Sequence, residues 1–309
     1  MGALTGSPIK AFGDDKPVNI KLSTISQNFL GLPDEFSSYD NARVAVLPVP
    51  YEATVSYGKG TSHGPDAIIT ASTQVELYDD ELGAEQYKVG VATLKPLRVT
   101  NLKPKEMSNE VEKAVLQILC DKKLPIVLGG EHSITPGIVR AMHAVYKNIT
   151  VVQFDAHADL RQEYEAEPMS HACAMARVRD ICPAVQIGIR NLSKEEAAWA
   201  NNEKFPIFYA DKLRKLDNWI NDAIDAIKTE CVYVTIDVDA FDSSVMPATG
   251  TPEPGGMNWY QVTDFLRTLT RQRKVVGFDL VELSPIKGFH ACDFLVAKLA
   301  YKCIGYWSA

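Results

Sequence analysis

Several features that mark large classes of protein are missing from this sequence. No apolar run approaches the roughly 20 residues that a membrane-spanning helix requires, and the N-terminus has no apolar segment like that of a signal peptide. The six cysteines are scattered, and no CxxC pair occurs among them. We therefore expect a cytoplasmic protein with no membrane partner, whose cysteines are reduced, buried thiols.

Positive charge is also scarce. The chain has 32 lysine and arginine residues against 39 aspartates and glutamates, a formal net charge of −7, and no basic stripe. Nucleic acid is not expected as a partner, because phosphate contacts need clustered lysine or arginine. The phosphate loop GxxxxGK[ST], a GxGxxG turn after a strand and the nucleophile elbow GxSxG are absent as well. An acidic protein does suit a small cationic substrate.

What the sequence does contain is the pattern of an α/β fold. Eight short β-rich runs occur at residues 42–49, 88–94, 124–130, 150–156, 184–190, 205–210, 231–237 and 274–283. Helical patterns lie between most of them or close the chain, at residues 64–78, 107–123, 135–146, 171–180, 219–230, 258–272 and 291–307. Such alternation, with strands apolar on both faces, predicts a largely parallel sheet covered on each side. We expect an N-terminal arm over residues 1–40 and one domain over residues 41–309.

Polar residues gather where four of the runs end. GGEH follows the third run, DAHAD the fourth, DVDAFD the seventh and VELSP the eighth. Because ligands bind beyond the carboxyl ends of strands in a parallel sheet, these segments predict one shared site. A single aspartate at a strand end is usually a turn former or a helix cap. A single histidine is usually an ordinary surface or core residue, and we interpret His63, His143 and His290 in that way.

The spacing of the polar residues predicts a metal site. Residues at alternate positions of a strand project to the same side, and unpaired carboxylates cannot share a poorly hydrated site without a compensating cation. Alternate positions at two strand ends, together with the histidine of the GGEH turn, give six candidate ligands: His132, Asp155, His157, Asp159, Asp237 and Asp239. Six ligands exceed what one ion normally takes, so two adjacent ions are expected. Mostly oxygen ligands favour Mn²⁺ over zinc.

The combination of GGEH, DAHAD, IDVDAFD, PATGTPEPGG and VELSP resembles the signature of the ureohydrolases, the family of arginases and agmatinases, from about residue 60 to the C-terminus. The resemblance implies a three-layer α/β/α sandwich around an eight-stranded, mostly parallel sheet. It also implies two Mn²⁺ ions in each subunit of a homo-oligomer, a trimer or hexamer. One ion would be bound by His132, Asp155, Asp159 and Asp237, and the other by Asp155, His157, Asp237 and Asp239.

The same resemblance implies catalytic roles in releasing urea from a guanidino compound. Two cations lower the pKa of water, and Asp159 could accept the proton that the water loses. Glu282 in VELSP would hold the guanidinium by charge-assisted hydrogen bonds. His171 in MSHACAM would transfer a proton near the leaving amine. A zinc cluster of His171, Cys173 and Cys182 is the alternative for this segment, although a fourth ligand and a standard spacing are missing.

The loop after Asp159 bears on the substrate. It carries Glu163, Glu165 and Glu167, where arginase-like proteins place asparagine and serine. An acidic loop favours a tail that ends in an ammonium and repels a carboxylate, although an ordinary solvated loop can look the same. We expect agmatine to be hydrolysed to putrescine and urea, with Glu163 and Glu165 at the substrate tail. Aminopropylagmatine is the next candidate, followed by guanidinobutyrate and arginine.

Two other classes of function stay open. A phosphoesterase could use the same two ions, but it should also show lysine, arginine or a helix N-terminus aimed at phosphate, and no such cluster adjoins the ligands. A non-catalytic relative should have lost a ligand, Glu282 or His171, and none is missing. The chain departs from the usual family pattern at Glu131, Phe241 and Ser243, where aspartate, leucine and proline are commoner. The last two changes put the surroundings of the ligands in question, and a bulkier Phe241 could reshape the rim of the site.

Overall fold

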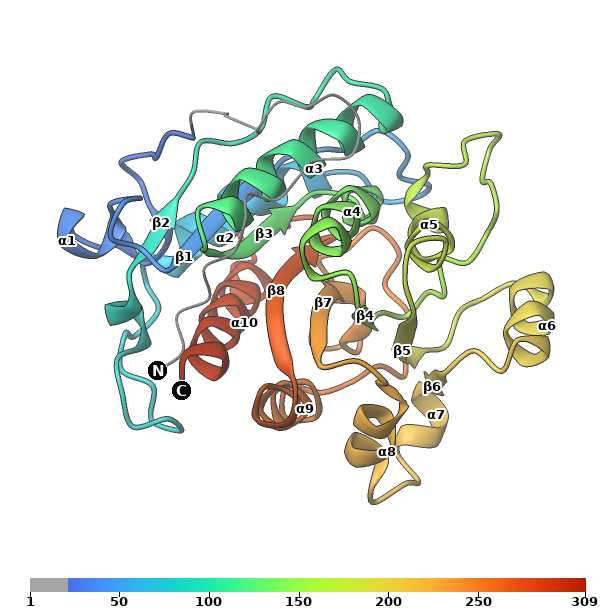
Figure 1. The fold of residues 1–309 in the computed structure, drawn as a ribbon. Helices are drawn as coiled ribbons and strands as arrows, with labels where there is room; N and C mark the ends of the chain where they lie inside the picture. Colours follow the sequence, from blue (N-terminus) through green and yellow to red (C-terminus); the bar gives the residue numbers. More distant parts are fainter. Residues whose placement is uncertain (1–21) are drawn as a thin grey trace.

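The computed structural model describes residues 22–309, and these form one layered structure around a single sheet (Figure 1). Its strands are β1 (Val44–Val49), β2 (Val91–Thr93), β3 (Leu124–Gly129), β4 (Ile149–Phe154), β5 (Ala184–Ile189), β6 (Ile207–Tyr209), β7 (Cys231–Asp237) and β8 (Lys274–Val281). They lie in the order β2-β1-β3-β8-β7-β4-β5-β6, and every neighbouring pair is parallel. Each predicted run therefore forms a strand, and the mostly parallel sheet that we expected is parallel throughout.

The helices of the described residues lie mainly between consecutive strands. They are α1 (Asp34–Ser37), α2 (Gly64–Ser72), α3 (Pro104–Cys120), α4 (Thr135–Tyr146), α5 (Ala174–Arg179), α6 (Lys194–Asn202), α7 (Ala210–Leu213), α8 (Trp219–Ala226), α9 (Trp259–Gln272) and α10 (Ala291–Ser308). Short 3₁₀ turns occur at η1 (Phe29–Gly31), η2 (Thr61–His63), η3 (Gln86–Val89), η4 (His132–Ile134), η5 (His171–Cys173) and η6 (Val238–Ala240). Within this part of the chain, no helix is both long and apolar enough to cross a membrane.

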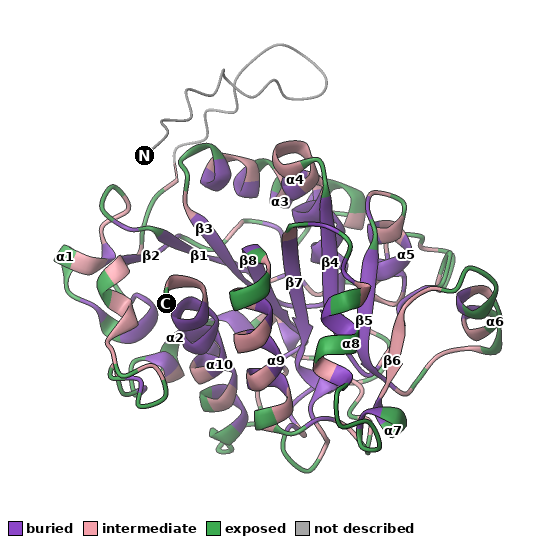
Figure 2. Cartoon of the chain, turned by 60° about the horizontal axis from the view of Figure 1, so that its bottom comes forward, coloured by how far each residue is buried: buried purple, intermediate pink, exposed green. Residues whose placement is uncertain are grey.

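Alternate residues of the longer strands pack in two separate hydrophobic cores. In β1, Val44 and Val46 pack in the core that α2, α8, α9 and α10 cover, whereas Ala45 and Leu47 pack in the core that α3, α4 and α5 cover. Seven of the strands are almost wholly buried between these two helical layers, whereas the edge strand β6 is only partly buried (Figure 2). The predicted three-layer α/β/α sandwich is confirmed.

The N-terminal arm predicted over residues 1–40 lies partly outside the described residues, which begin at residue 22. From there the chain runs beside β2, because the Ile25 amide donates to the Thr93 carbonyl at 3.1 Å. Phe29 and Leu30 are buried in the core beneath α2 and α10. Residues 25–30 therefore contribute apolar side chains to the layered structure.

Most helices begin and end close to the predicted patterns, but α2 and α8 end earlier than predicted, and α1, α6 and α7 were not predicted. Helix α2 ends at Ser72, although the pattern extends to residue 78. Helix α6 was not predicted, although a capping box precedes it: the Ser193 hydroxyl accepts from the Glu196 amide at 3.2 Å, and the Glu196 carboxylate accepts from the Ser193 amide at 2.7 Å. The S-x-x-E spacing was the signal that could have found this helix.

Replacing Ser193 by alanine is expected to lower the free energy of unfolding by about 1 kcal/mol, because an amide at the start of α6 loses its acceptor. Chemical denaturation measures the change. Ser26→Ala is the matched control, since Ser26 is exposed and lies outside every helix. Equal unfolding free energies for the two variants would contradict the capping role.

Candidate metal centre and active-site cavity

Four neighbouring strands deliver the candidate site residues. His132 follows β3, Asp155 follows β4, Asp237 is the last residue of β7, and Glu282 follows β8. These strands are adjacent in the order β3-β8-β7-β4, and because they are parallel, their carboxyl ends meet at one edge of the sheet. The structure therefore brings together residues that are up to 150 positions apart in sequence.

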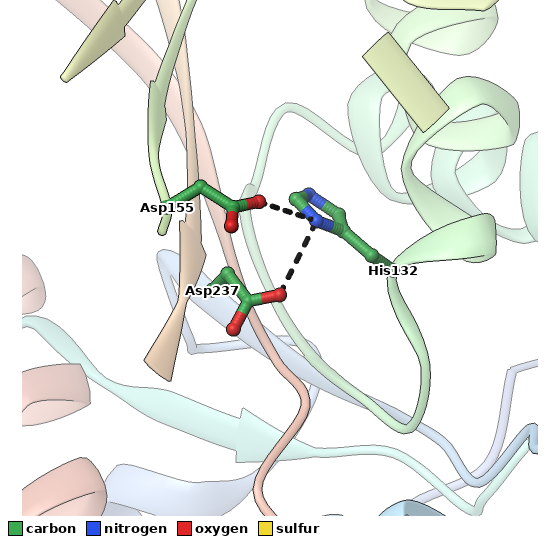
Figure 3. Close-up of side chains that lie close together, drawn as sticks. All are labelled: His132, Asp155 and Asp237. Carbon is green, nitrogen blue, oxygen red and sulfur yellow. Dashed lines mark ion pairs between the residues drawn. The ribbon is translucent and has the colours of Figure 1, made fainter. Parts of the chain in front are cut away.

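The imidazole of His132 faces a group of carboxylates (Figure 3). Its Nδ1 lies 3.1 Å from Asp155 Oδ2, 3.2 Å from Asp159 Oδ2 and 3.5 Å from Asp237 Oδ2. His132 is 1% exposed and Asp155 is fully buried, so little water reaches these atoms. A second group surrounds His157, whose Nδ1 lies 2.9 Å from Asp239 Oδ2 and 3.6 Å from Asp155 Oδ1.

The hydrogen bond on the other side of the His132 ring shows which nitrogen can bind a cation. His132 Nε2 lies 2.9 Å from the Thr235 hydroxyl, which itself donates to Asp279 Oδ1 at 2.5 Å. The hydroxyl oxygen of Thr235 must therefore accept from Nε2–H. In neutral His132 this leaves Nδ1 with a lone pair, and this buried atom has no hydrogen-bond partner. A lone pair that faces three carboxylates fits a bound cation.

Two groups of potential ligand atoms are close enough to hold metal ions. His132, Asp155 and Asp237 form one, and Asp155, His157 and Asp239 form the other, with the ligand atoms of each group within 4.8 Å of one another. Asp155 belongs to both groups. Oxygen atoms predominate and each group contains one imidazole, a donor set that suits Mn²⁺.

The electrostatics of the site also call for a cation. Burial, and then repulsion from nearby carboxylates, raise the pKa of Asp159, Asp237 and Asp239 above the ordinary value of an aspartate. Burial, and then the charge of Glu131, raise the pKa of Glu282 in the same way. Positive charge placed among these carboxylates would stabilise their ionised forms.

Two of the candidate residues have an unusual backbone. Asp159 has a φ of 52° and Glu282 a φ of 67°, in the left-handed region that L-residues rarely adopt. The turn at Glu282 directs its carboxylate back to the end of β3, where Oε1 accepts from the His132 amide at 2.7 Å. Strained conformations of this kind cluster at functional sites.

A cavity of about 220 Å³ opens beside the carboxylates. Six of the candidate residues line it: His157, Asp159, His171, Asp237, Asp239 and Glu282. Tyr57, Arg161 and Tyr164 lie in its wall as well, and Tyr57 is 82% exposed. This volume is below the lower end of the range for drug-sized ligands, which indicates a small substrate.

Glu163 and Glu165 are not among the residues that line this cavity, and both are exposed. Glu167 is partly buried and accepts from the Met169 amide at 2.8 Å. The three acidic side chains of this loop therefore lie outside the cavity, whereas Arg161 and Tyr164 of the same loop are in its wall.

Three further sequence interpretations are resolved by the positions of side chains. In the part of the chain that is described, no group of potential metal ligands includes Cys173 or Cys182, so the alternative zinc cluster is wrong. Phe241 is 1% exposed and does not line the cavity, so it does not reshape the rim. All six cysteines are free thiols, but Cys120 is exposed and Cys231 is partly exposed, so the expectation of buried thiols is wrong for these two.

Sequence reasoning missed the polar residues that support the ligands. Asp279 is fully buried in β8 and accepts from Thr235, and from Tyr233 at 2.6 Å. A single aspartate in the apolar run KVVGFDLV was a signal that could have found it, because a buried carboxylate needs partners. Thr54, which lies next to His171, and Glu131, which accepts from Thr54, were missed as well.

Comparisons with known proteins agree with this geometry. The model of the arginase family matches residues 42–305. An N(1)-aminopropylagmatine ureohydrolase of Synechocystis sp. is 44% identical over 89% of this chain and 92% of its own. An agmatinase of Pyrococcus horikoshii is 34% identical over 86% of this chain and 92% of its own. The solved structure of the agmatine ureohydrolase of Thermoplasma volcanium is 32% identical, with a TM-score of 0.82 over 91% of this chain and 94% of its own.

Most of the chain thus matches both the family model and relatives above 30% identity, and its strand ends carry the metal-ligating residue types of a hydrolase. The chain therefore belongs to the arginase family and is a metal-dependent amidinohydrolase, an enzyme that hydrolyses guanidino C–N bonds.

Proposed function

We propose that the protein releases urea from a guanidino compound with a positively charged tail, with N(1)-aminopropylagmatine as the preferred substrate and agmatine as the second. The observation that carries the proposal is that Asp155 is shared by two groups of ligand atoms, next to a cavity that Glu282 and His171 line. Two adjacent cations beside a small cavity are an arrangement suited to hydrolysis.

The residues of the two groups would hold two Mn²⁺ ions. The proposed ligands are His132, Asp155, Asp159 and Asp237 for one ion, and Asp155, His157, Asp237 and Asp239 for the other. When bound, the ions supply Lewis acidity and lower the pKa of water to near neutrality.

Side chains around the cavity would orient the substrate and move its protons. Glu282 lines the cavity and would accept hydrogen bonds from the guanidinium. Such hydrogen bonds are strongest when donor and acceptor are both charged. Asp159 would accept the proton that the attacking water loses. His171 would donate a proton to the amine nitrogen that leaves when the tetrahedral intermediate collapses to urea.

The order of the two substrates rests on relatives. Those at 44% and 36% identity, from Synechocystis sp. and Thermus thermophilus, are N(1)-aminopropylagmatine ureohydrolases. The agmatinases of Pyrococcus horikoshii and Halalkalibacterium halodurans are 34% and 30% identical. This supports placing N(1)-aminopropylagmatine before agmatine, the reverse of the order expected from the sequence. An aminopropyl extension adds length and an amine, so its end would extend toward the exposed Glu163 and Glu165 outside the cavity.

Urea release from four substrates tests the proposal directly. The purified protein is loaded with Mn²⁺ and given N(1)-aminopropylagmatine, agmatine, guanidinobutyrate and arginine. We expect the highest kcat/KM for N(1)-aminopropylagmatine, a lower value for agmatine, and little turnover of the two compounds that carry a carboxylate. Faster turnover of arginine or guanidinobutyrate would contradict the proposed tail, and urea from none of the four would contradict the substrate class.

Neutralising the acidic loop tests the position of the tail. The double variant Glu163→Gln/Glu165→Gln is expected to raise KM for N(1)-aminopropylagmatine roughly two- to five-fold, the size of exposed charge interactions, with kcat unchanged. KM for agmatine should change less, because its shorter tail ends nearer the ions. Asp180→Asn is a suitable control, since Asp180 is an exposed carboxylate at the end of α5 and does not line the cavity. Equal effects on both substrates would contradict a contact with the longer tail.

A further inference from the structure

Glu131 is a fully buried carboxylate that the proposed mechanism does not use. It accepts four hydrogen bonds, from the Ala53 amide at 2.6 Å, the Thr54 amide at 2.7 Å, the Thr54 hydroxyl at 2.7 Å and the Ser133 hydroxyl at 2.5 Å. In all four bonds the partner is the donor and a carboxylate oxygen of Glu131 is the acceptor. Glu131 thus anchors the segment that carries Thr54.

The Thr54 hydroxyl connects Glu131 to His171. Its oxygen lies 3.2 Å from Nδ1 of His171 and accepts from the His171 amide at 3.0 Å. A hydroxyl has one proton, and Thr54 gives that proton to Glu131. Toward Nδ1 the Thr54 oxygen can therefore act only as an acceptor, and Nδ1 must carry a hydrogen to make the bond.

We infer that Thr54, held by Glu131, is the positioning residue that fixes neutral His171 with its hydrogen on Nδ1 and leaves the Nε2 lone pair for proton transfer in the cavity. The inference rests on the proposed function, since it concerns the proton that His171 would move. His171 takes a proton on Nε2 from solvent water in the cavity, becomes an imidazolium, and gives that proton to the leaving amine, while Nδ1–H stays bonded to Thr54 throughout. The ring then returns to its starting form without rotating.

A second hydroxyl near Nδ1 supplies a control. Ser170 Oγ lies 3.3 Å from Nδ1, on the residue that precedes His171. Unlike Thr54, it has no bond to Glu131 that fixes the direction of its proton. Ser170 can therefore accept from Nδ1–H or donate to it, and it does not by itself select a tautomer.

Substitutions at Thr54 test the inference. Thr54→Val keeps the shape of the side chain but removes the hydroxyl, and it is expected to lower kcat roughly 10- to 100-fold with KM little changed, within the contribution of general acid–base catalysis. Thr54→Ser keeps the hydroxyl and should retain most of kcat. Ser170→Ala should cause a much smaller loss than Thr54→Val. Bound Mn²⁺ and the melting temperature of each variant show that the fold and the ions are intact.

A double variant separates a positioning role from a structural one. If Thr54 acts through His171, Thr54→Val should lower kcat no further in a His171→Asn background, whereas independent effects would add. Thr54→Val should also change the pH profile of kcat, because the tautomer that donates and accepts at Nε2 is no longer favoured. Full additivity, or a Thr54→Val enzyme with the kcat and pH profile of the wild type, would overturn the inference.

Substituting Glu131 gives a readout that does not depend on turnover. In Glu131→Gln the side-chain amide can donate to Thr54, so the Thr54 hydroxyl becomes able to donate to His171 Nδ1 and the hydrogen of neutral His171 moves to Nε2. Nitrogen-15 NMR of histidine-labelled protein, with diamagnetic Mg²⁺ in place of Mn²⁺ and His171→Asn for assignment, measures the tautomer. An Nδ1–H tautomer in the wild type and Nε2–H in the variant supports the inference.

An Nε2–H tautomer in the wild type overturns it. Because this measurement needs no substrate, it remains decisive even if the wild-type protein releases urea from none of the four compounds. The proposed function and the inference can thus fail separately.

Discussion

Asp155→Asn is expected to lower the rate of urea release more than about 100-fold. Changing a residue that only hydrogen-bonds to a metal ligand lowers activity by about 10- to 100-fold, so the loss at Asp155 should be larger. Asp155 belongs to both groups of ligand atoms, so one substitution weakens both proposed ions. Each of its oxygens accepts one hydrogen bond, Oδ1 from the His157 amide at 2.6 Å and Oδ2 from Gln153 at 2.6 Å, which leaves each oxygen a lone pair for a cation. An asparagine at this position keeps the size of the side chain but removes its charge.

Metal content and activity measured together separate this result from a loss of folding. Bound Mn²⁺ per chain in Asp155→Asn should fall well below that of the wild type, while the far-ultraviolet circular dichroism spectrum stays the same. Asp279→Asn is a graded control: Asp279 is equally buried but contacts His132 only through Thr235, so activity should fall less. Asp242→Asn, outside both groups, should keep its metal. An Asp155→Asn protein with a full complement of Mn²⁺ would refute the shared-ligand arrangement.

Removing the divalent cations is expected to destabilise the protein, and more strongly as the pH rises. Burial, and then repulsion between carboxylates, raise the pKa values of four buried acids: Asp159, Asp237, Asp239 and Glu282. A group whose pKa is higher in the folded state binds its proton more tightly there than in the unfolded chain. The stability that it contributes is complete below its unfolded pKa and is lost as the pH rises through its folded pKa.

The pKa values of the two histidines of the site are also raised, so their contributions to stability fall with rising pH in the same way. Burial lowers the pKa of His157, but Asp239 and Asp155 outweigh it and raise the value to about 12. His157 therefore also contributes stability at low pH that is lost as the pH rises. The contribution of Asp155 to stability has the opposite pH dependence. Burial raises its pKa, but His132 and His157 outweigh burial and lower it, so the stability that Asp155 contributes is lost only in acid. From weakly acidic to alkaline pH, the groups with raised pKa values outnumber Asp155, so the free energy of unfolding of the metal-free protein should fall as the pH rises.

Thermal unfolding with and without Mn²⁺ at a series of pH values measures the effect. The gain in melting temperature on adding Mn²⁺ should grow with pH, since the ions take over the role of the protons. A free ion concentration 100 times the dissociation constant stabilises the folded state by about 2.7 kcal/mol. Asp155→Asn should show little of this gain. A metal-free protein that becomes more stable between pH 5 and pH 9 would contradict the predicted sign.

The fold was largely predictable because its determinants are local. Every strand except the partly buried edge strand β6 is an apolar run that is buried on both faces, and three of the helices have proline in their first turn, at Pro65, Pro104 and Pro136. The gathering of the candidate ligands was predictable as well, since parallel strands bring their carboxyl ends to one edge. The helix α6 was missed because its apolar pattern is weak, although the Ser193–Glu196 capping box marks its start.

What the sequence could not indicate are contacts between segments far apart in the chain. Thr54 and Glu131 are 77 residues apart, and nothing near either of them in sequence shows that they meet beside His171. The position of Glu163 depends on the turn around Glu165 and Ala166, both of which have a positive φ. Residue type alone predicted an acidic tail pocket here, whereas backbone conformation places these side chains outside the cavity.

The position of β8 determines when a newly made chain can acquire its catalytic centre. The strand is the last to be synthesised, yet it lies in the middle of the sheet between β3 and β7. Before residues 274–281 leave the ribosome, β2-β1-β3 and β7-β4-β5-β6 are two half-sheets with open edges at β3 and β7, which are prone to wrong pairing. His132 belongs to one half, and Asp155 and Asp237 to the other. A nascent chain therefore carries a divided metal site until its final strand joins the halves.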